Sequence, residues 1–198
     1  MLCLINRLHN IDNINSKRAA VLLRHGERDE IPMGSFGTEI LLSEDGIKDS
    51  ISFGKKISDL EIVHIYSSPI ARCVQTAGYI KMGLATKRQD IQITEEAQLG
   101  TPGFHIANAD IAGKEYLEYG CSGVFERFSQ GEKIPGIASV ESLKREAMQW
   151  INAKTSKKGV TLFVTHDALI AHFAFANGIY TYSKENWINF LDGIIIIF

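Results

Sequence analysis

Short apolar runs, separated by longer stretches with helical spacing, dominate the pattern of the chain. Three of these runs are nearly continuous and rich in β-branched residues, which predicts strands covered on both faces: residues 19–23, 62–66 and 160–164. The closing run, residues 194–198, predicts a further buried strand. Strands that alternate with helices are typical of an α/β protein. We therefore predict a three-layer α/β/α architecture with a mainly parallel central sheet.

Helix signals fall between the predicted strands. Ser43 is placed to cap a helix with acidic residues in its first turn, and Ser68–Pro69 predicts a cap followed by a first-turn proline. Ser139 precedes an apolar stripe with helical spacing. Asn177–Gly178 predicts the end of an apolar helix that begins near Asp167.

Two regions give no clear pattern. Residues 6–18 form a polar stretch that we interpret as irregular. Residues 94–136 contain glycines, aromatic residues and charges without a sustained period. We predict that this second region is a helical insertion with loops over the functional site.

Composition adds constraints of a general kind. The 198 residues, with a formal net charge of −2, predict one globular domain over 1–198. A pI near 6.3 argues against nucleic-acid or membrane-surface partners. The three cysteines are odd in number and form no Cys-x-x-Cys pair, and the apolar N-terminal run is too short for a signal peptide. We therefore expect a cytoplasmic protein; the sequence is silent on its oligomeric state.

Cationic side chains follow each predicted internal strand. The first strand leads into Arg24, His25 and Arg28, the second into Arg72, and the third into His166. Because ligands of open α/β sheets bind at the carboxyl ends of the strands, these side chains are expected to meet at one edge. Clustered cations need a counter-charge, and a phosphate suits guanidinium forks. The pattern predicts a phosphoryl site.

The imidazoles at this edge predict chemistry beyond binding. A neutral histidine can act as a nucleophile, and His25 is placed to attack phosphorus while arginines hold the other oxygens. This arrangement predicts a phosphohistidine intermediate. His166 would donate to the phosphoryl oxygens, and a nearby carboxyl group would protonate the leaving oxygen and later help to activate water.

These motifs resemble the histidine phosphatase superfamily, also called phosphoglycerate-mutase-like. The resemblance rests on Arg24-His25-Gly26, on Ser67-Ser68-Pro69 with Arg72, Gln75, Thr76 and Ala77, on Leu42-Ser43-Glu44-Asp45-Gly46, and on His166 after a strand. It spans roughly Val21 to Gly178. The resemblance implies that His25 is the residue phosphorylated, that Arg24, Arg72 and His166 complete the phosphate pocket, and that neither metal nor cofactor is needed.

The proton donor has two candidates. Arg28 and the pair His166-Asp167 are similar to the acid-phosphatase branch of the family, in which the aspartate after the second histidine is the donor. The short chain is similar to the other branch, where the donor is usually a glutamate in a Glu-x-x-x-Gly context, which Glu96 to Gly100 matches. Asp167 is slightly favoured, and Arg28 is expected to contact phosphate.

Two other chemistries compete with this interpretation. Cys121 and Arg127 have the Cys-x5-Arg spacing of cysteine-dependent phosphatases, but no apolar strand precedes Cys121. A metallohydrolase using His25, His166 and Asp167 would place a divalent cation beside arginines, which is unfavourable.

The sequence thus predicts a metal-independent phosphomonoester hydrolase for a small phosphorylated metabolite, in a pocket that phosphate or vanadate can also occupy. Residues 27–32 lack the Trp-Asn segment of the cofactor-dependent mutases, which favours hydrolysis. A phosphomutase of the same superfamily and a catalytically silent phosphoryl-binding module remain the alternatives. His105 is predicted in a loop that either touches substrate or lies at the surface, and His64 and His172 are predicted to be packing residues.

Overall fold

A single mixed sheet forms the centre of the molecule. The structure, a computed structural model, describes residues 3–32, 34–84 and 90–198. Within these residues, five strands have the order β3-β2-β4-β1-β5. They are β1 (Arg18–Arg24), β2 (Ile62–Ser67), β3 (Ile93–Glu95), β4 (Gly159–Thr165) and β5 (Gly193–Ile197). The first four are parallel, and β5 pairs antiparallel with β1. The predicted mainly parallel sheet is confirmed, with the C-terminal run as its antiparallel edge strand.

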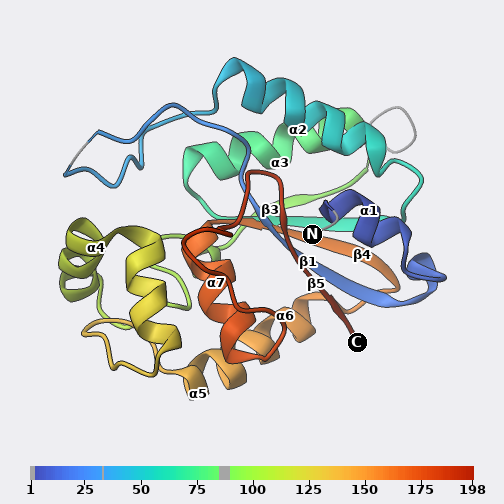
Figure 1. Ribbon diagram of the computed structural model, residues 1–198. Coiled ribbons are helices and arrows are strands. Elements are labelled where there is room, and N and C mark those ends of the chain that lie inside the picture. Colours follow the sequence, from blue (N-terminus) through green and yellow to red (C-terminus); the bar gives the residue numbers. More distant parts are fainter. Residues whose placement is uncertain (1–2, 33, 85–89) are drawn as a thin grey trace.

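Helices cover both faces of this sheet and complete the three predicted layers (Figure 1). One face carries α1 (Leu4–His9), α2 (Glu44–Lys56) and α3 (Ala71–Leu84). The other carries α4 (Ala109–Ser129), α5 (Val140–Ser142), the π-helical turn η3 (Leu143–Ala147), α6 (Met148–Lys154) and α7 (Asp167–Ala176). Two 3-10 turns are η1 (Ile14–Ser16) and η2 (Ala97–Leu99). No helix of the described residues is long and apolar enough to cross a bilayer.

The alternation of side chains along β1 divides the core in two. Ala19, Val21 and Leu23 face one cluster, which includes Phe53 of α2 and further residues of α3. Ala20 and Leu22 face the other cluster, which α4, α6 and α7 complete. Successive residues of a strand point to opposite faces, so a central strand covered on both sides has to be apolar throughout. This requirement explains the continuous apolar run that the sequence shows at β1.

The backbones of α2 and α3 come into close contact at two glycines. A Cβ atom added at Gly54 would lie 2.2 Å from the carbonyl oxygen of Ile80, and one at Gly83 would lie 2.2 Å from that of Ile51. No side chain fits at either position while the helices keep this distance. The contact holds α3 against α2, and both helices begin at the edge of the sheet where the cationic residues lie.

Several predictions from the sequence differ from the observed elements. The stretch 6–18 is not wholly irregular, because it contains the second half of α1 and all of η1, with Leu8 and Ile14 buried. The segment from residue 94 onward does not begin as an insertion, since Thr94 and Glu95 belong to β3. A strand of three residues is too short to show a period.

The start of α3 also differs from the prediction. The helix begins at Ala71, and Ser68 does not cap it. The Ser68 hydroxyl instead accepts from the backbone N–H of Ile70 at 3.2 Å and contacts His166. Ser43, by contrast, caps α2 as predicted, accepting from Gly46 N–H at 3.0 Å.

The close contact of α2 and α3 predicts that alanine in place of a glycine destabilises the protein at the contact, at Gly54, and stabilises it away from the contact, at Gly78. We expect Gly54→Ala to lower the free energy of unfolding by about 1–3 kcal/mol, because overpacking forces the two helices apart. Gly78→Ala is the matched control: Gly78 is in α3 with no atom within 4 Å of an added Cβ, so the change should raise stability by roughly 0.5–1 kcal/mol. Urea unfolding of both variants measures the difference, and equal effects would contradict this account of the contact.

Candidate active site

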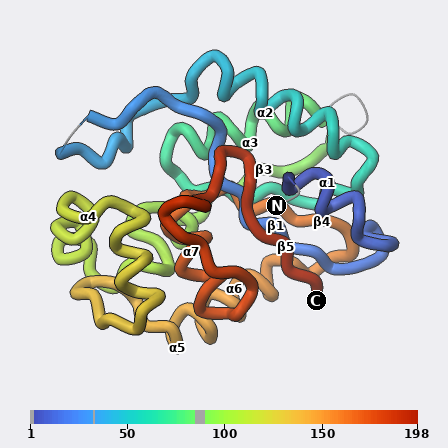
Figure 2. Tube along the Cα trace, in the orientation of Figure 1, coloured from blue at the N-terminus to red at the C-terminus, as the bar shows by residue number. Residues whose placement is uncertain are grey.

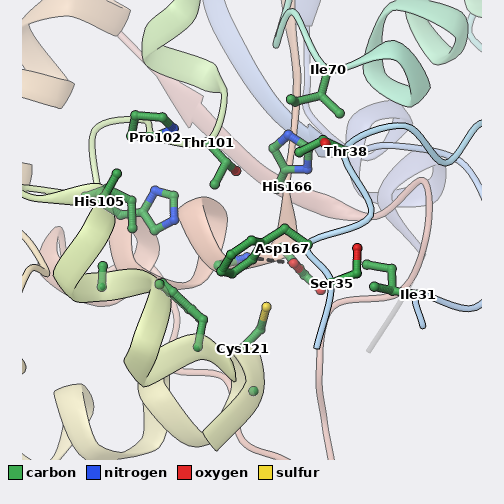
Figure 3. Close-up of a pocket in the computed structure, with 18 of the residues that line it drawn as sticks. Ile31, Ser35, Thr38, Ile70, Thr101, Pro102, His105, Cys121, His166 and Asp167 are labelled. Carbon is green, nitrogen blue, oxygen red and sulfur yellow. Dashed lines mark hydrogen bonds between the residues drawn. The ribbon is translucent and has the colours of Figure 1, made fainter. Parts of the chain in front are cut away.

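A cavity of about 420 Å³ lies at the carboxyl ends of β1 and β4. Its lining includes all the predicted cationic residues: Arg24, His25, Arg28, Arg72 and His166. The opposite wall comes from the segment between β1 and α2, from residues 101–106, and from α4. Figure 2 shows the β1–α2 segment and α4 extending from the same end of the sheet, and Figure 3 shows the side chains that converge there. The segment 94–136 therefore contributes to the cavity wall.

Backbone and side-chain contacts fix the ring of His25. Its backbone N–H donates to the carbonyl of Thr165 at 3.0 Å, and its Nδ1 lies 2.8 Å from the carbonyl oxygen of Gly26. A carbonyl only accepts, so Nδ1 carries the proton and Nε2 keeps its lone pair. Gly26 itself is held by a hydrogen bond of 2.9 Å from its N–H to the Thr76 hydroxyl.

Gly26 is required by close packing rather than by its backbone conformation. An added Cβ would lie 2.8 Å from the Ser50 hydroxyl and 3.0 Å from the carbonyl oxygen of Gly46, both in α2. The turn after β1 is thus pressed against the first turns of α2. This packing sets the position from which the His25 ring enters the cavity.

His25 is neutral in this environment. Burial lowers its pKa to about 3 against the opposing hydrogen bond to Gly26, and the charges of Arg72 and Arg24 lower it further. The side chain is buried. A neutral imidazole with a fixed Nδ1–H presents Nε2 as a nucleophile at any pH above this value.

Arg72 lies beside the His25 lone pair. Its Nε donates to His25 Nε2 at 3.1 Å, and its Nη1 donates to the carbonyl oxygen of Gly37 at 2.5 Å. The guanidinium enters from the first turn of α3 and is buried. Burial lowers the pKa of Arg72 from its ordinary value, but an arginine stays charged in proteins. Arg72 therefore places a full positive charge next to the candidate nucleophile.

His166 faces His25 across the cavity. The two ring centroids are 5.5 Å apart in an edge-to-face arrangement. His166 Nε2 lies 3.0 Å from the Ser68 hydroxyl, and Nδ1 lies 3.5 Å from Arg72 Nη2. Burial, then the charges of His25 and Arg72, lower the pKa of His166 well below its ordinary value. Both imidazoles are thus neutral.

Arg24 and Asp167 form an ion pair in the wall of the cavity. Nη2 of Arg24 lies 2.9 Å from Asp167 Oδ2, which also accepts from the indole N–H of Trp187 at 3.0 Å. Arg24 Nη1 donates to the carbonyl of Ile188, and the guanidinium lies 4.2 Å from the Phe190 ring centroid. Burial would raise the pKa of Asp167, but Arg24 and these hydrogen bonds together hold it below its ordinary value. Asp167 is therefore an ionised carboxylate.

Arg28 adds a third guanidinium at the same end of the cavity. Its Nη1 donates to the backbone carbonyl of Asp29 at 2.6 Å. Burial, followed by repulsion from Arg72 and Arg24, lowers its pKa. Because Asp167 neutralises Arg24, the positive charges of Arg28 and Arg72 remain without a carboxylate partner among the described residues. A phosphate dianion carries the matching charge.

The comparison with protein families decides the classification. The family model of the histidine phosphatase superfamily (branch 1) matches residues 20–176. The chain belongs to the histidine phosphatase superfamily. The resemblance given by the sequence motifs is thereby confirmed, and the fold is the phosphoglycerate mutase-like α/β fold.

Relatives within this superfamily include both mutases and phosphatases. A 2,3-bisphosphoglycerate-dependent phosphoglycerate mutase of Thermoplasma acidophilum is 25% identical over 163 residues, which are 79% of this chain and 76% of the relative. A phosphoglycerate mutase of Bacillus anthracis has a TM-score of 0.61 at 17% identity, covering 93% of this chain and 90% of the other. Phosphoserine phosphatase of Entamoeba histolytica, in complex with 3-phosphoglyceric acid, has a TM-score of 0.58 at 18% identity, covering 90% and 94%.

The structure does not bring Glu96 to the cavity. Its carboxylate lies 2.5 Å from Lys154 Nζ in α6, and Glu96 is not among the residues that line the cavity. Although Glu96 matches the Glu-x-x-x-Gly context of a superfamily proton donor, this ion pair directs the side chain elsewhere. Of the two candidate carboxyl groups, only Asp167 lines the cavity, and it is ionised.

The cysteine-dependent alternative is contradicted by the surroundings of Cys121 and Arg127. The Cys121 thiol points into the cavity (Figure 3), but desolvation raises its pKa to about 12, whereas a nucleophilic cysteine needs a lowered pKa. Arg127 pairs with Glu115 and Glu132 and does not line the cavity. For the metallohydrolase alternative, no cluster of three or more His, Cys, Asp or Glu side chains within residues 3–32, 34–84 and 90–198 could hold a metal ion.

Several residues at the site were missed or misplaced by the sequence interpretation. Trp187 and Phe190 hold Asp167 and Arg24, but they follow a segment without a periodic pattern. His105 was expected either at substrate or at the surface, and it is buried in the cavity wall beside Tyr116 of α4. His64 and His172 contact neighbouring protein groups outside this cavity, as predicted for packing residues.

The environments of two histidines predict different titration behaviour. We expect the ring nitrogens of His25 to keep the chemical shifts of a neutral Nδ1–H tautomer from pH 8 to about 5, because burial lowers its pKa to about 3. His9 is the control, since its hydrogen bond to Asp59 raises its pKa above 6.5, so it should become protonated in this range. Nitrogen-15 NMR of the imidazoles follows both rings. Protonation of His25 together with His9 would contradict the proposed environment.

Proposed function

We propose that the protein is a metal-independent phosphomonoester hydrolase that forms a phosphohistidine intermediate on His25. The observation that carries this proposal is the neutral His25 ring in the cavity wall, whose Nε2 carries no proton and accepts a hydrogen bond from the Arg72 guanidinium. The arginines supply the positive charge that phosphoryl transfer requires. The superfamily contains phosphatases and mutases, and membership supports an enzyme of this general type.

In the first step, His25 Nε2 attacks the phosphorus atom of the bound ester. Arg72 Nε first releases Nε2 and donates to a phosphoryl oxygen instead. The Nε2–P bond then forms while the bond between phosphorus and the ester oxygen breaks, and the departing alcohol oxygen takes a proton from solvent. Nδ1–H remains bonded to the Gly26 carbonyl, which keeps the ring in one orientation. Arg72 and Arg28 neutralise the phosphoryl oxygens as charge builds up on them.

His166 contributes a donor to the same phosphoryl group. The Ser68 hydroxyl accepts from Ile70 N–H, so its own proton is free to donate to His166 Nε2. We assign the remaining proton of His166 to Nδ1, 3.5 Å from Arg72 Nη2. The N–H groups of His166 Nδ1 and Arg72 Nη2 can then donate to one shared acceptor, and a phosphoryl oxygen would be that acceptor.

In the second step, water attacks phosphorus and the bond to His25 Nε2 breaks, which releases inorganic phosphate and restores the neutral ring. A proton must leave the attacking water. Asp167 is ionised in the resting site and can accept a proton, whereas it holds none to donate to the leaving group. We therefore propose Asp167 as the base of the second step in place of the donor role expected from the sequence.

A phosphomutase is the second candidate, and the Thermoplasma relative favours it. Both activities share the phosphohistidine intermediate. They differ in the acceptor, because a mutase returns the phosphoryl group to its substrate while a hydrolase transfers it to water. Release of inorganic phosphate in stoichiometric turnover distinguishes the two.

The nucleophile assignment predicts the effect of His25→Ala. We expect hydrolysis of an activated aryl phosphate, measured in excess chelator, to fall by roughly 10³-fold or more. Wild-type protein quenched during turnover should carry acid-labile phosphate on His25, and the variant should carry none. His9→Ala, at an exposed histidine far from the cavity, is the matched control and should retain the wild-type rate. Full activity of His25→Ala would overturn the mechanism.

The role of Asp167 predicts which step slows in Asp167→Asn. If the carboxylate accepts the proton from water, the variant should release one equivalent of alcohol in a fast burst and then turn over roughly 10²-fold more slowly. Phosphohistidine should accumulate. Glu96→Gln should leave both phases unchanged because Glu96 lies outside the cavity. Loss of the burst itself with poor leaving groups would instead make Asp167 the proton donor of the first step.

A further inference from the structure

The cationic side chains of the cavity are concentrated at one end. Arg24, Arg28 and Arg72 are close enough that the charges of the other two lower the pKa of Arg28. No other lysine or arginine of the described residues lines the cavity. Asp167 neutralises Arg24, and one phosphate dianion neutralises the remaining two guanidinium groups. A second anionic group on the substrate would therefore have no counter-ion farther along the cavity.

The walls beyond the phosphate end are mainly apolar. Ile31 and Phe36 come from the β1–α2 segment, and Ala112, Gly113 and Leu117 come from α4. The two walls meet, because a Cβ added at Gly113 would lie 3.3 Å from the Phe36 ring. With a volume of about 420 Å³, the cavity is of the size that encloses a small organic molecule. Transfer of a charged group into such surroundings without a partner is strongly unfavourable.

The lining also contains the polar residues Ser35, Thr38, Thr101 and Asp110, and one further polar pair lacks hydrogen-bond partners within the described part of the chain. The hydroxyl of Tyr116 and the Nδ1 of His105 are both buried and have no hydrogen-bond partner among the described residues. Their rings are neighbours, with centroids 6.2 Å apart. Burial raises the pKa of Tyr116 and lowers that of His105, so both groups are neutral. Buried polar atoms normally find a partner, and here both residues line the cavity.

We propose that the substrate is the phosphomonoester of an uncharged, largely apolar alcohol that carries one neutral hydrogen-bonding group, which Tyr116 and His105 bind. This inference rests on the proposed function and adds the substrate class to it. It places the phosphate at the arginines, the carbon skeleton between the β1–α2 segment and α4, and the neutral polar group at the buried pair. Substrates with a carboxylate or a second phosphate beside the reacting ester are disfavoured.

A set of matched substrates tests the proposal. Para- and meta-substituted benzyl phosphates are prepared with an ethyl, a hydroxymethyl or a carboxylate substituent, so that ethyl and hydroxymethyl have nearly the same shape. For the better-positioned isomer, we expect kcat/KM of the hydroxymethyl ester to exceed that of the ethyl ester about tenfold. The carboxylate ester should be slower than the ethyl ester by roughly 100-fold, since its charge has no partner.

Variants of two tyrosines in α4 identify the group responsible. Tyr116→Phe removes only the buried hydroxyl and should abolish the preference, so that the ratio of kcat/KM for the hydroxymethyl ester to that for the ethyl ester falls from about tenfold to about one. Tyr119→Phe is the control, because Tyr119 is exposed and does not line the cavity, and it should keep the preference. A merely structural role of Tyr116 would lower kcat/KM equally for all three esters.

The outcomes separate failure of this inference from failure of the proposed function. If the esters are hydrolysed through phosphohistidine but the carboxylate ester is the best substrate, or Tyr116→Phe lowers all rates equally, the substrate class is wrong and the hydrolase remains. If no ester is hydrolysed and His25 is never labelled, the hydrolase is wrong, and the substrate class falls with it.

Discussion

The contact between Arg72 and His25 is the interaction on which the arrangement of the site depends. Burial is the largest cause that opposes protonation of His25, and the Arg72 guanidinium, whose Nε donates to the imidazole lone pair at 3.1 Å, acts in the same direction. His25, the proposed nucleophile, therefore stays unprotonated without a general base to remove a proton. The same guanidinium can hold a phosphoryl oxygen when an ester binds. One side chain thus helps to keep His25 neutral and supplies positive charge for a phosphoryl group, and the fold has to place it accurately.

The fold meets this requirement through parallel strands and closely packed helices. His25 follows β1, His166 follows β4, and Arg72 begins α3 just after β2, so the register of three adjacent strands brings the groups together. Gly54 and Gly83 hold α3 against α2, whose first turns press on the glycine that follows His25. Packing between two helices on one face of the sheet is thereby connected to the orientation of His25.

Much of this arrangement could be predicted because it depends on local patterns. Buried parallel strands have to be apolar throughout, and ligand-binding residues follow such strands, so the runs at β1, β2 and β4 located His25, Arg72 and His166. From the sequence, Ser68 is predicted to cap a helix. The sequence cannot show that its hydroxyl contacts His166, which is 98 residues away. The roles of Trp187 and Phe190 could not be predicted for the same reason, since these residues contact Asp167 and Arg24 only in the folded structure.

The two candidate carboxyl groups show most clearly that motif spacing predicts neither the direction of a side chain nor its protonation state. Glu96 has the expected context, but an ion pair with Lys154 directs it away from the cavity, while Asp167 reaches the cavity and meets Arg24, which holds it ionised. Protonation state and direction are properties of neighbours that come from other elements. The carbonyl of Gly37 is a further example, because it accepts from Arg72. Gly37 has a φ of 56°, which favours glycine, and it lies in the segment that also supplies Phe36 to the apolar wall. Arg72 therefore contributes its charge to the cationic end of the cavity and, through Nη1, also bonds the segment that supplies Phe36 to the apolar wall.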